Sequence, residues 1–191
     1  VRTLLGDTGF AQLCALDEAP APLLAYLAPR QPFAHRLGLY AEHLLAFWFQ
    51  AAAHAELLAH NQALVDPKSG QTIGAMDFLV RLNGALYHLE LTCKYYGSPH
   101  GLPETLLGLN RQDALLRKAA KLVQQSSLLQ TEVGQAWWSQ QPWAHEPVQA
   151  ATVVRGMAFA QHGLPEAVAP LNPDAWSGGY ALDWADCWAE Q

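Results

Sequence analysis

Apolar residues recur at helical spacing in one long stretch in the first third of the chain. The run HRLGLYAEHLLAFWFQAAA (35–53) contains no proline, and its apolar positions repeat every three or four residues. The pattern predicts an amphipathic helix over residues 35–53. Upstream, prolines interrupt residues 1–34 repeatedly, so we expect only short helical pieces and loops there.

Three segments with strand-like patterns follow this helix. ELLAHNQALV (56–65) predicts a first strand, although its leucine and alanine content leaves a helix as the alternative. IGAMDFLVRL (73–82) and LYHLELTCKYY (86–96) predict two more strands, and the Asn83-Gly84 pair between them is the strongest short-range hairpin signal. Alternation with period two places one set of polar side chains of the last segment on a single face. These are His88, Glu90, Thr92 and Lys94.

The rest of the chain completes an α/β pattern. A loop rich in glycine and proline (97–110) precedes a basic amphipathic helix at about 111–125, and the β-branched run 148–159 predicts a further strand. The order αβββαβ predicts a three-layer α-β-α sandwich around a small mixed sheet. We therefore expect an N-terminal helical and loop extension (1–34), a core domain (35–160) and a C-terminal tail (161–191). The tail is rich in tryptophan, and we expect it to pack on the core.

Composition and charge narrow the class of protein. A chain of 191 residues suits one domain with a real core, and a net charge of −6 counts mildly against a dedicated nucleic-acid-binding protein. Four of the eleven basic residues nevertheless fall within the predicted helix at 111–125, and carboxylates around a metal ion would make the net charge misleading. The charge balance therefore leaves nucleic acid open as a partner.

Two further features bear on the compartment. No apolar stretch is long enough to span a membrane, and the opening run VRTLLGDTGF lacks the basic and apolar blocks of a secretory signal. Cys14, Cys93 and Cys187 are few, odd in number and far apart, which is typical of free thiols. We expect a cytoplasmic protein with no membrane partner.

A pair of carboxylates on the predicted hairpin is the main candidate for chemistry. Asp77 interrupts an apolar strand, which is costly unless the carboxylate has a partner or a metal ion. Glu90 and Lys94 project from one face of the next strand. Two carboxylates from paired strands could share Mg²⁺ or Mn²⁺, which would polarise a phosphodiester, and a lysine could offset the developing charge. The alternative is an ordinary surface pair on a solvent-facing strand.

The segments LGLYAEHLLAFWF, ELLAHN, TIGAMDFLV, HLELTCKYY and GLNRQD resemble an uncharacterised bacterial domain-of-unknown-function family, DUF1853. The resemblance covers about residues 35–125, and the segment LNPDAWSGGY (171–180) shows weaker similarity. The order of helix, strand, Asp strand and Glu/Lys strand also looks like the PD-(D/E)XK phosphodiesterase superfamily, which includes restriction endonucleases. That resemblance implies a restriction-endonuclease-like core with Asp77 and Glu90 as metal ligands.

The same resemblance assigns roles to other residues. Glu42, in the first helix, matches an acid that joins the metal shell in many superfamily members. The superfamily places its lysine two residues after the acid, whereas here that position is Thr92. Lys94 lies two residues further on, about 6.6 Å along the strand at ~3.3 Å per residue. Lys94 is therefore the nearest candidate for the catalytic lysine.

The basic helix offers a further candidate surface. Arg111 and Lys118 suit contacts with a substrate phosphate, because basic side chains and helix starts bind phosphate groups. A helix face exposed to solvent is the commoner explanation for such charges. Arg111 is the exception, because we expect it to lie close to the hairpin site.

Two functions are consistent with these observations. The first is a metal-dependent phosphodiesterase, similar to a nuclease, that acts on DNA or RNA with Mg²⁺ or Mn²⁺. The second is a catalytically inactive PD-(D/E)XK-fold module for binding or assembly, which the displaced lysine and the acidic charge favour.

Overall fold

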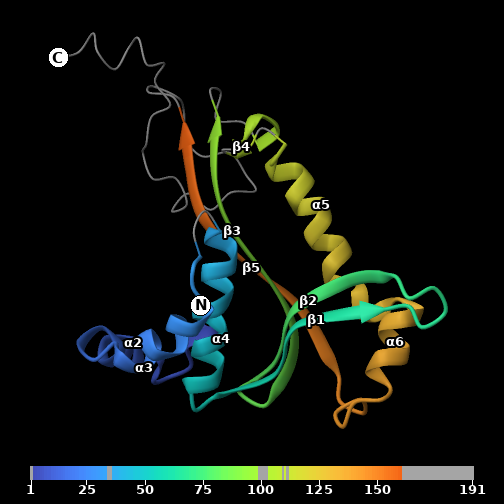
Figure 1. Cartoon of the computed structure of the whole chain (residues 1–191), viewed down its shortest axis with the longest axis horizontal. Helices are drawn as coiled ribbons and strands as arrows, with labels where there is room; N and C mark the ends of the chain where they lie inside the picture. Colours follow the sequence, from blue (N-terminus) through green and yellow to red (C-terminus); the bar gives the residue numbers. More distant parts are fainter. Residues whose placement is uncertain (1, 34–35, 99–102, 109, 111, 161–191) are drawn as a thin grey trace. The chain divides into compact units, whose positions relative to one another are not determined.

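The computed structural model describes residues 2–33, 36–98, 103–108, 110 and 112–160, and shows a mixed α/β protein with a five-stranded mixed sheet (Figure 1). The α-helices are α1 (Arg2–Leu5), α2 (Gly9–Glu18), α3 (Ala21–Leu27), α4 (Leu37–Ala51), α5 (Leu115–Ser126) and α6 (Glu132–Trp138). Short 3-10 helices are η1 (Ala28–Arg30), η2 (Pro103–Thr105) and η3 (Leu128–Gln130). The strands are β1 (Ala55–Val65), β2 (Thr72–Leu82), β3 (Ala85–Ser98), β4 (Leu107–Gly108) and β5 (Val148–Ala160).

The hairpin predicted around Asn83-Gly84 is present. β2 and β3 pair antiparallel, from Leu82↔Ala85 at the turn to Phe78↔Leu89. Asn83 and Gly84 both have positive φ, at 49° and 83°, which a two-residue hairpin of this kind requires and which asparagine and glycine tolerate best. The segment 56–65, for which a helix was the alternative, is strand β1 and pairs antiparallel with β2.

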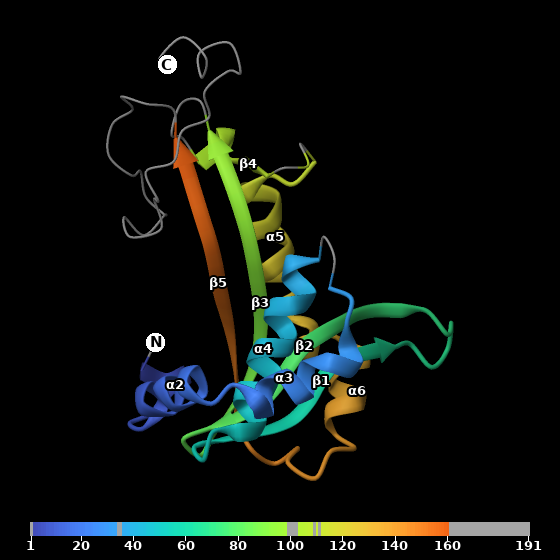
Figure 2. The ribbon, with the colours of Figure 1, turned by 60° about the vertical axis from the view of Figure 1, so that its left-hand side comes forward.

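The sheet order is β1-β2-β3-β4, with β5 also paired to β3. Both views show the arrowheads of β3 and β5 pointing the same way, so this pair is parallel (Figures 1 and 2). Gly156 of β5 has φ of 151°, and a Cβ atom there would lie 1.7 Å from the carbonyl oxygen of Lys94. Only glycine allows β5 to approach β3 this closely at Lys94.

The core of the hairpin is divided between two apolar clusters. Phe78, Val80 and Leu82 of β2 pack with Leu89 of β3 and with buried residues of α4. Met76 of β2 packs instead with buried side chains outside that cluster, Leu64 and Leu128. The change from one cluster to the other falls between Met76 and Phe78, at Asp77.

The chain forms two compact units. Unit 1 comprises residues 1–91 and 124–153, and unit 2 comprises residues 92–123 together with 154–160 of the described chain. The N-terminal helices α1, α2 and α3 thus belong to the same unit as α4. The boundaries predicted at residues 35 and 160 stay predictions. The tail at 161–191, with its tryptophans and LNPDAWSGGY, lies outside the described residues, as does Arg111.

The predicted element order is present as α4, β1, β2, β3, α5 and β5, with β4 and α6 in addition. No helix among the described residues has the length and apolar character needed to cross a membrane. Cys14 and Cys93, the two cysteines in the described ranges, are free thiols.

Candidate functional site

Asp77 and Glu90 lie on facing strands of the hairpin, where each carboxylate accepts a hydrogen bond from the opposite backbone. The regular pairing of β2 with β3 stops at Phe78↔Leu89, one step before this pair. From there the carboxylates bond to the opposite backbone. Asp77 Oδ2 accepts the Leu91 N–H at 2.8 Å, and Glu90 Oε1 accepts the Asp77 N–H at 3.4 Å. The two acids therefore hold the strands together where the backbone ladder ends.

The other neighbour of Asp77 is also irregular. His60↔Phe78 and Gln62↔Met76 flank the position on β1 opposite Asp77, which Asn61 occupies. Asn61 has φ of 50°, a left-handed conformation that costs about 1–3 kcal/mol for a residue other than glycine. Asparagine is several-fold enriched in such conformations, but no glycine or proline beside Asn61 marks an irregular position in this strand. Asn61, Asp77 and Glu90 thus lie side by side on three neighbouring strands, at positions where the backbone or its pairing departs from a regular strand.

Glu90 is fully buried, with 0% of its surface exposed, and His88 beside it is 1% exposed. His88 Nε2 and Glu90 Oε1 are 2.8 Å apart. The sequence left one alternative open, in which the polar face of β3 is exposed to solvent and Glu90 and Lys94 form an ordinary surface pair. That alternative is wrong for His88, Glu90 and Thr92, which are all buried. The reason is that both faces of this part of β3 are covered, so alternation no longer separates inside from outside.

The second carboxylate oxygen of Glu90 and Nδ1 of the neighbouring His88 are the unusual atoms of the site. Oε2 is buried, and no hydrogen-bond donor reaches it from the described residues. A buried polar atom without a partner is costly, and more so on an acidic group. An oxygen of this kind, with a second carboxylate across the strand, has the chemistry that a hard divalent cation prefers. The predicted part of Asp77 and Glu90 as ligands of Mg²⁺ or Mn²⁺ stays a prediction.

A third protein ligand is not assembled with them. Within the described ranges, no three His, Cys, Asp or Glu side chains form a group that could hold a metal ion. Glu42 is half-buried on α4, one turn before the buried Ala46. Its predicted part in the metal shell stays a prediction. Mg²⁺ usually keeps several water ligands and needs only one or two carboxylates, so a pair remains compatible with it.

Lys94 has a carboxylate partner of its own in unit 2. Its Nζ donates to Asp113 Oδ2 at 2.6 Å, and both side chains are partly exposed. Asp113 is held in place by the backbone, since its carbonyl accepts the Gly108 N–H at 2.7 Å. Buried Tyr96 lies near this pair, and burial and then the Asp113 charge raise the pKa of its hydroxyl. Asp113 lies 19 residues after Lys94, and no local signal pairs the two.

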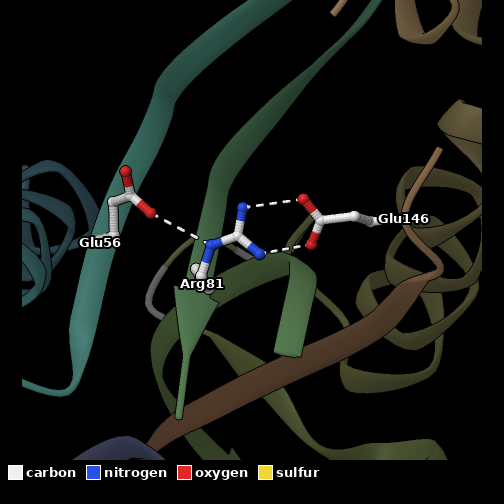
Figure 3. A network of polar contacts seen from close by, with 3 residues as sticks. All are labelled: Glu56, Arg81 and Glu146. Carbon is white, nitrogen blue, oxygen red and sulfur yellow. Dashed lines mark hydrogen bonds and ion pairs between the residues drawn. The ribbon is translucent and has the colours of Figure 1, made fainter. Parts of the chain in front are cut away.

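The strongest ion network of the hairpin lies four residues from Asp77 on the same strand. Arg81 Nε donates to Glu56 of β1 at 3.1 Å, and its Nη1 and Nη2 donate to the two oxygens of Glu146 (Figure 3). These bonds raise the pKa of Arg81 and lower the pKa of Glu146. The only sequence signal was an arginine inside an apolar strand.

Two histidines lie against the aromatic cluster between α4 and the N-terminal segment. The ring centroids of His43 and His60 are 5.6 Å apart, and His60 stacks on Phe78. Arg30 lies 3.7 Å above the Tyr26 ring nearby. Burial first, and then the positive charge of Arg30, lower the pKa of His43; the pKa of His60 is lowered by burial, then by His43 and Arg30. Within unit 1, this cluster packs α3 and the segment that follows it against α4.

Comparisons with known proteins identify the family and nothing more specific. Neither the curated proteins nor the solved structures include a significant match. The family model for a domain of unknown function, DUF1853, matches residues 4–190, which is nearly the whole chain. The chain therefore belongs to the DUF1853 family.

Proposed function

We propose that this chain is a metal-dependent phosphodiesterase with a PD-(D/E)XK core, related to bacterial nucleases, that cleaves DNA or RNA. The observation that carries the proposal is that Asp77 and Glu90 face each other across the hairpin, with Glu90 Oε2 buried and reached by no donor of the described residues. The three-layer arrangement is part of the same proposal. Its support is the order of α4, β1, β2, β3, α5 and β5.

The two carboxylates have different tasks in this proposal. Asp77 is only half-buried, so its carboxylate is the one that solvent and a substrate can approach. Glu90 is fully buried and anchored by His88, so it holds its position without relying on water. Mg²⁺ or Mn²⁺, when bound by this pair, would polarise the phosphodiester and lower the pKa of a water molecule.

The buried surroundings of Glu90 make the site selective for a cation. A carboxylate removed from water gains more from a nearby positive charge than an exposed one does, because the local dielectric is low. The hydrogen bonds from Leu91 and His88 hold one oxygen of each carboxylate. Such preorganisation reduces the cost of assembling ligands when the cation binds.

A second candidate function is a catalytically inactive module of the same fold for binding or assembly. The observation that favours it is the ion pair of Lys94 with Asp113, which occupies the lysine that the superfamily pattern would use. Lys94 and Asp113 both belong to unit 2, whereas the carboxylate pair belongs to unit 1. The two candidate functions share the fold and differ in whether phosphodiesters are cleaved.

A cleavage assay separates the two functions. Wild-type protein is incubated with single- and double-stranded DNA and RNA, with Mg²⁺, Mn²⁺ or EDTA. We expect cleavage that needs the metal and that falls about a thousandfold in Asp77→Ala, because a catalytic metal contributes several kcal/mol and each ~1.4 kcal/mol is tenfold in rate.

Asp17→Ala is the matched control, because Asp17 is an exposed carboxylate on α2. It should cleave at the wild-type rate, and thermal denaturation should show that both variants are folded. Equal cleavage by wild type and Asp77→Ala would show that the activity comes from another site or a contaminant. No cleavage by any of them, with folded protein, would favour the inactive module.

A further inference from the structure

Charged residues are divided unequally between the two units. Residues 1–91 and 124–153, which form unit 1, contain ten acidic and five basic residues. The described part of unit 2 contains only two acidic residues, Glu104 and Asp113. Its five basic residues are Lys94, Arg117, Lys118, Lys121 and Arg155. The described part of unit 2 is therefore net positive, whereas residues 161–191 of the same unit add five acidic residues and no basic ones, so that unit 2 as a whole is close to neutral.

Helix α5 concentrates this positive charge along one edge. Arg117 and Lys121 are one turn apart and exposed, and Lys118 lies next to them, half-buried. We call these three residues the basic edge of α5. Side chains at this spacing are neighbours on a helix surface, about 5–6 Å apart at Cβ.

The opposite side of α5 is engaged in packing. Leu122 is buried, and Leu115 packs against the buried pair Tyr96 and Leu106. The helix is thus fixed by its apolar side, and the basic edge faces outward. Arg117 is also oriented by the loop before the helix, because its Nη1 donates to the carbonyl of Gln112 at 2.8 Å.

As far as the structure describes the chain, Arg117 and Lys121 share the lack of a carboxylate partner with Arg30, Arg36, Lys68 and Arg155, and differ from these in lying one turn apart on one helix. Arg81 and Lys94 are both neutralised by carboxylates. Across the parts of the chain that the structure describes, Arg117 and Lys121 form no ion pair with a carboxylate. Two unneutralised charges one turn apart on a fixed helix suit a polyanion better than a single small ion.

We propose that the basic edge of α5 binds the phosphate backbone of a nucleic acid. This rests on the proposed function, for which it supplies the surface that holds the substrate independently of its sequence. An anionic membrane is the competing polyanion, since Leu116 and Val123 on the same helix are exposed. A helix that binds a membrane surface inserts its apolar face, however, and the main apolar side of α5 is already buried in the protein.

The test measures binding without cleavage. A fluorescein-labelled oligonucleotide, as a single strand and as a duplex, is titrated with full-length protein in EDTA, and anisotropy gives Kd at several salt concentrations. Lys121→Glu should weaken binding about tenfold at about 50 mM salt and reduce the log–log salt slope by about one, because each phosphate contact contributes close to one power of the salt concentration.

Lys68→Glu is the matched control, since it makes the same charge change at an exposed lysine of unit 1. It should bind nearly as wild type does. The proposal is overturned if Lys121→Glu and Lys68→Glu weaken binding equally, if wild type does not bind at low salt, or if the protein binds only vesicles of phosphatidylserine and phosphatidylcholine.

The outcome is independent of catalysis. Binding that depends on Lys121, without cleavage under any condition, would support the basic edge and refute the phosphodiesterase. Cleavage that Lys121→Glu leaves unchanged would support the phosphodiesterase and refute the basic edge.

Discussion

Strand β2 carries two polar sites four residues apart, and they are built in opposite ways. At Arg81, a guanidinium meets two carboxylates, and both oxygens of Glu146 accept a hydrogen bond. At Asp77, a carboxylate meets Glu90, and Glu90 Oε2 is left without a donor among the described residues. In the first site both oxygens of Glu146 are satisfied, whereas in the second only one oxygen of Glu90 is satisfied by the described residues.

The difference gives the Arg81 site a structural role and the Asp77 site a functional one in this account. Arg81 and Glu146 are each about one-quarter exposed, and they link β2 to the segment before β5. Glu90 is fully buried, so its missing partner cannot be replaced by bulk water. A folded protein keeps such an unsatisfied group where an ordered water molecule or ion reaches it, where strain is tolerated, or where a reaction needs it. Glu90 Oε2 is one of nine buried side-chain atoms without a partner among the described residues, and what distinguishes it is Asp77 on the facing strand.

The largest expected effect is on catalysis. Glu90→Gln keeps the shape of the side chain but removes its charge, and cleavage should fall about a thousandfold because the metal would be lost. Glu146→Gln makes the same chemical change in the complete site and should cleave within about twofold of wild type, which corresponds to less than ~0.5 kcal/mol. Single-turnover rates with Mn²⁺ measure both. Similar losses in the two variants would remove the distinction between the sites.

Stability should respond to the same two substitutions with opposite signs. Without added metal, Glu90→Gln should raise the free energy of unfolding by roughly 1–2 kcal/mol, because it removes a buried charge that lacks a full set of partners. Glu146→Gln should lower the melting temperature, because it breaks a two-bond ion pair with Arg81. Chemical and thermal denaturation in EDTA give both values. A fall in stability in both variants would mean that Glu90 is a structural residue.

The pH dependence sharpens the account of the Arg81 site. Arg81 holds the pKa of Glu146 below its ordinary value of 4.5. The stability from this pair is therefore present above pH 4.5 and is lost as the pH falls through the lowered pKa. Wild type and Glu146→Gln should differ in melting temperature at neutral pH and converge below pH 4.5. If the difference in melting temperature persists at lower pH, it comes from the packing of Glu146 rather than from its charge.

A smaller effect is expected at the histidines of the aromatic cluster. The pKa values of His43 and His60 are below the ordinary 6.5, so the unfolded chain takes up protons first as the pH falls. Stability should decline below pH 6.5 until the folded-state pKa values are passed. His43→Gln should reduce this decline, as measured by melting temperature against pH. An unchanged decline would exclude His43 as its source.

The sequence predicted most of what depends on local signals. Asn83-Gly84 located the hairpin because its positive φ angles favour these residue types. Helix α6 was missed, although Thr131 caps it by accepting the Gly134 N–H and Glu132 occupies its first turn. These two adjacent residues are the only local signals of the helix, and seven residues are too few to show a helical repeat of apolar positions.

The parts that could not be predicted depend on residues far apart in sequence. Alternation placed Glu90 on a polar face, but the burial of that face depends on segments that cover β3 from elsewhere in the chain. The pairing of Lys94 with Asp113, and of Arg81 with Glu146, joins residues 19 and 65 positions apart. Residue types suggested the Asp77 and Glu90 pair, and only the structure showed which carboxylate oxygen lacks a partner.

Calorimetric titration with Mn²⁺ tests the central claim most directly, because it asks whether the incomplete site takes up a cation. Wild type and Glu146→Gln should each bind one ion per chain with the same affinity, and Glu90→Gln should lose this binding. Wild-type binding in Glu90→Gln, or no binding by folded wild type, would contradict the assignment of Asp77 and Glu90 as a metal site.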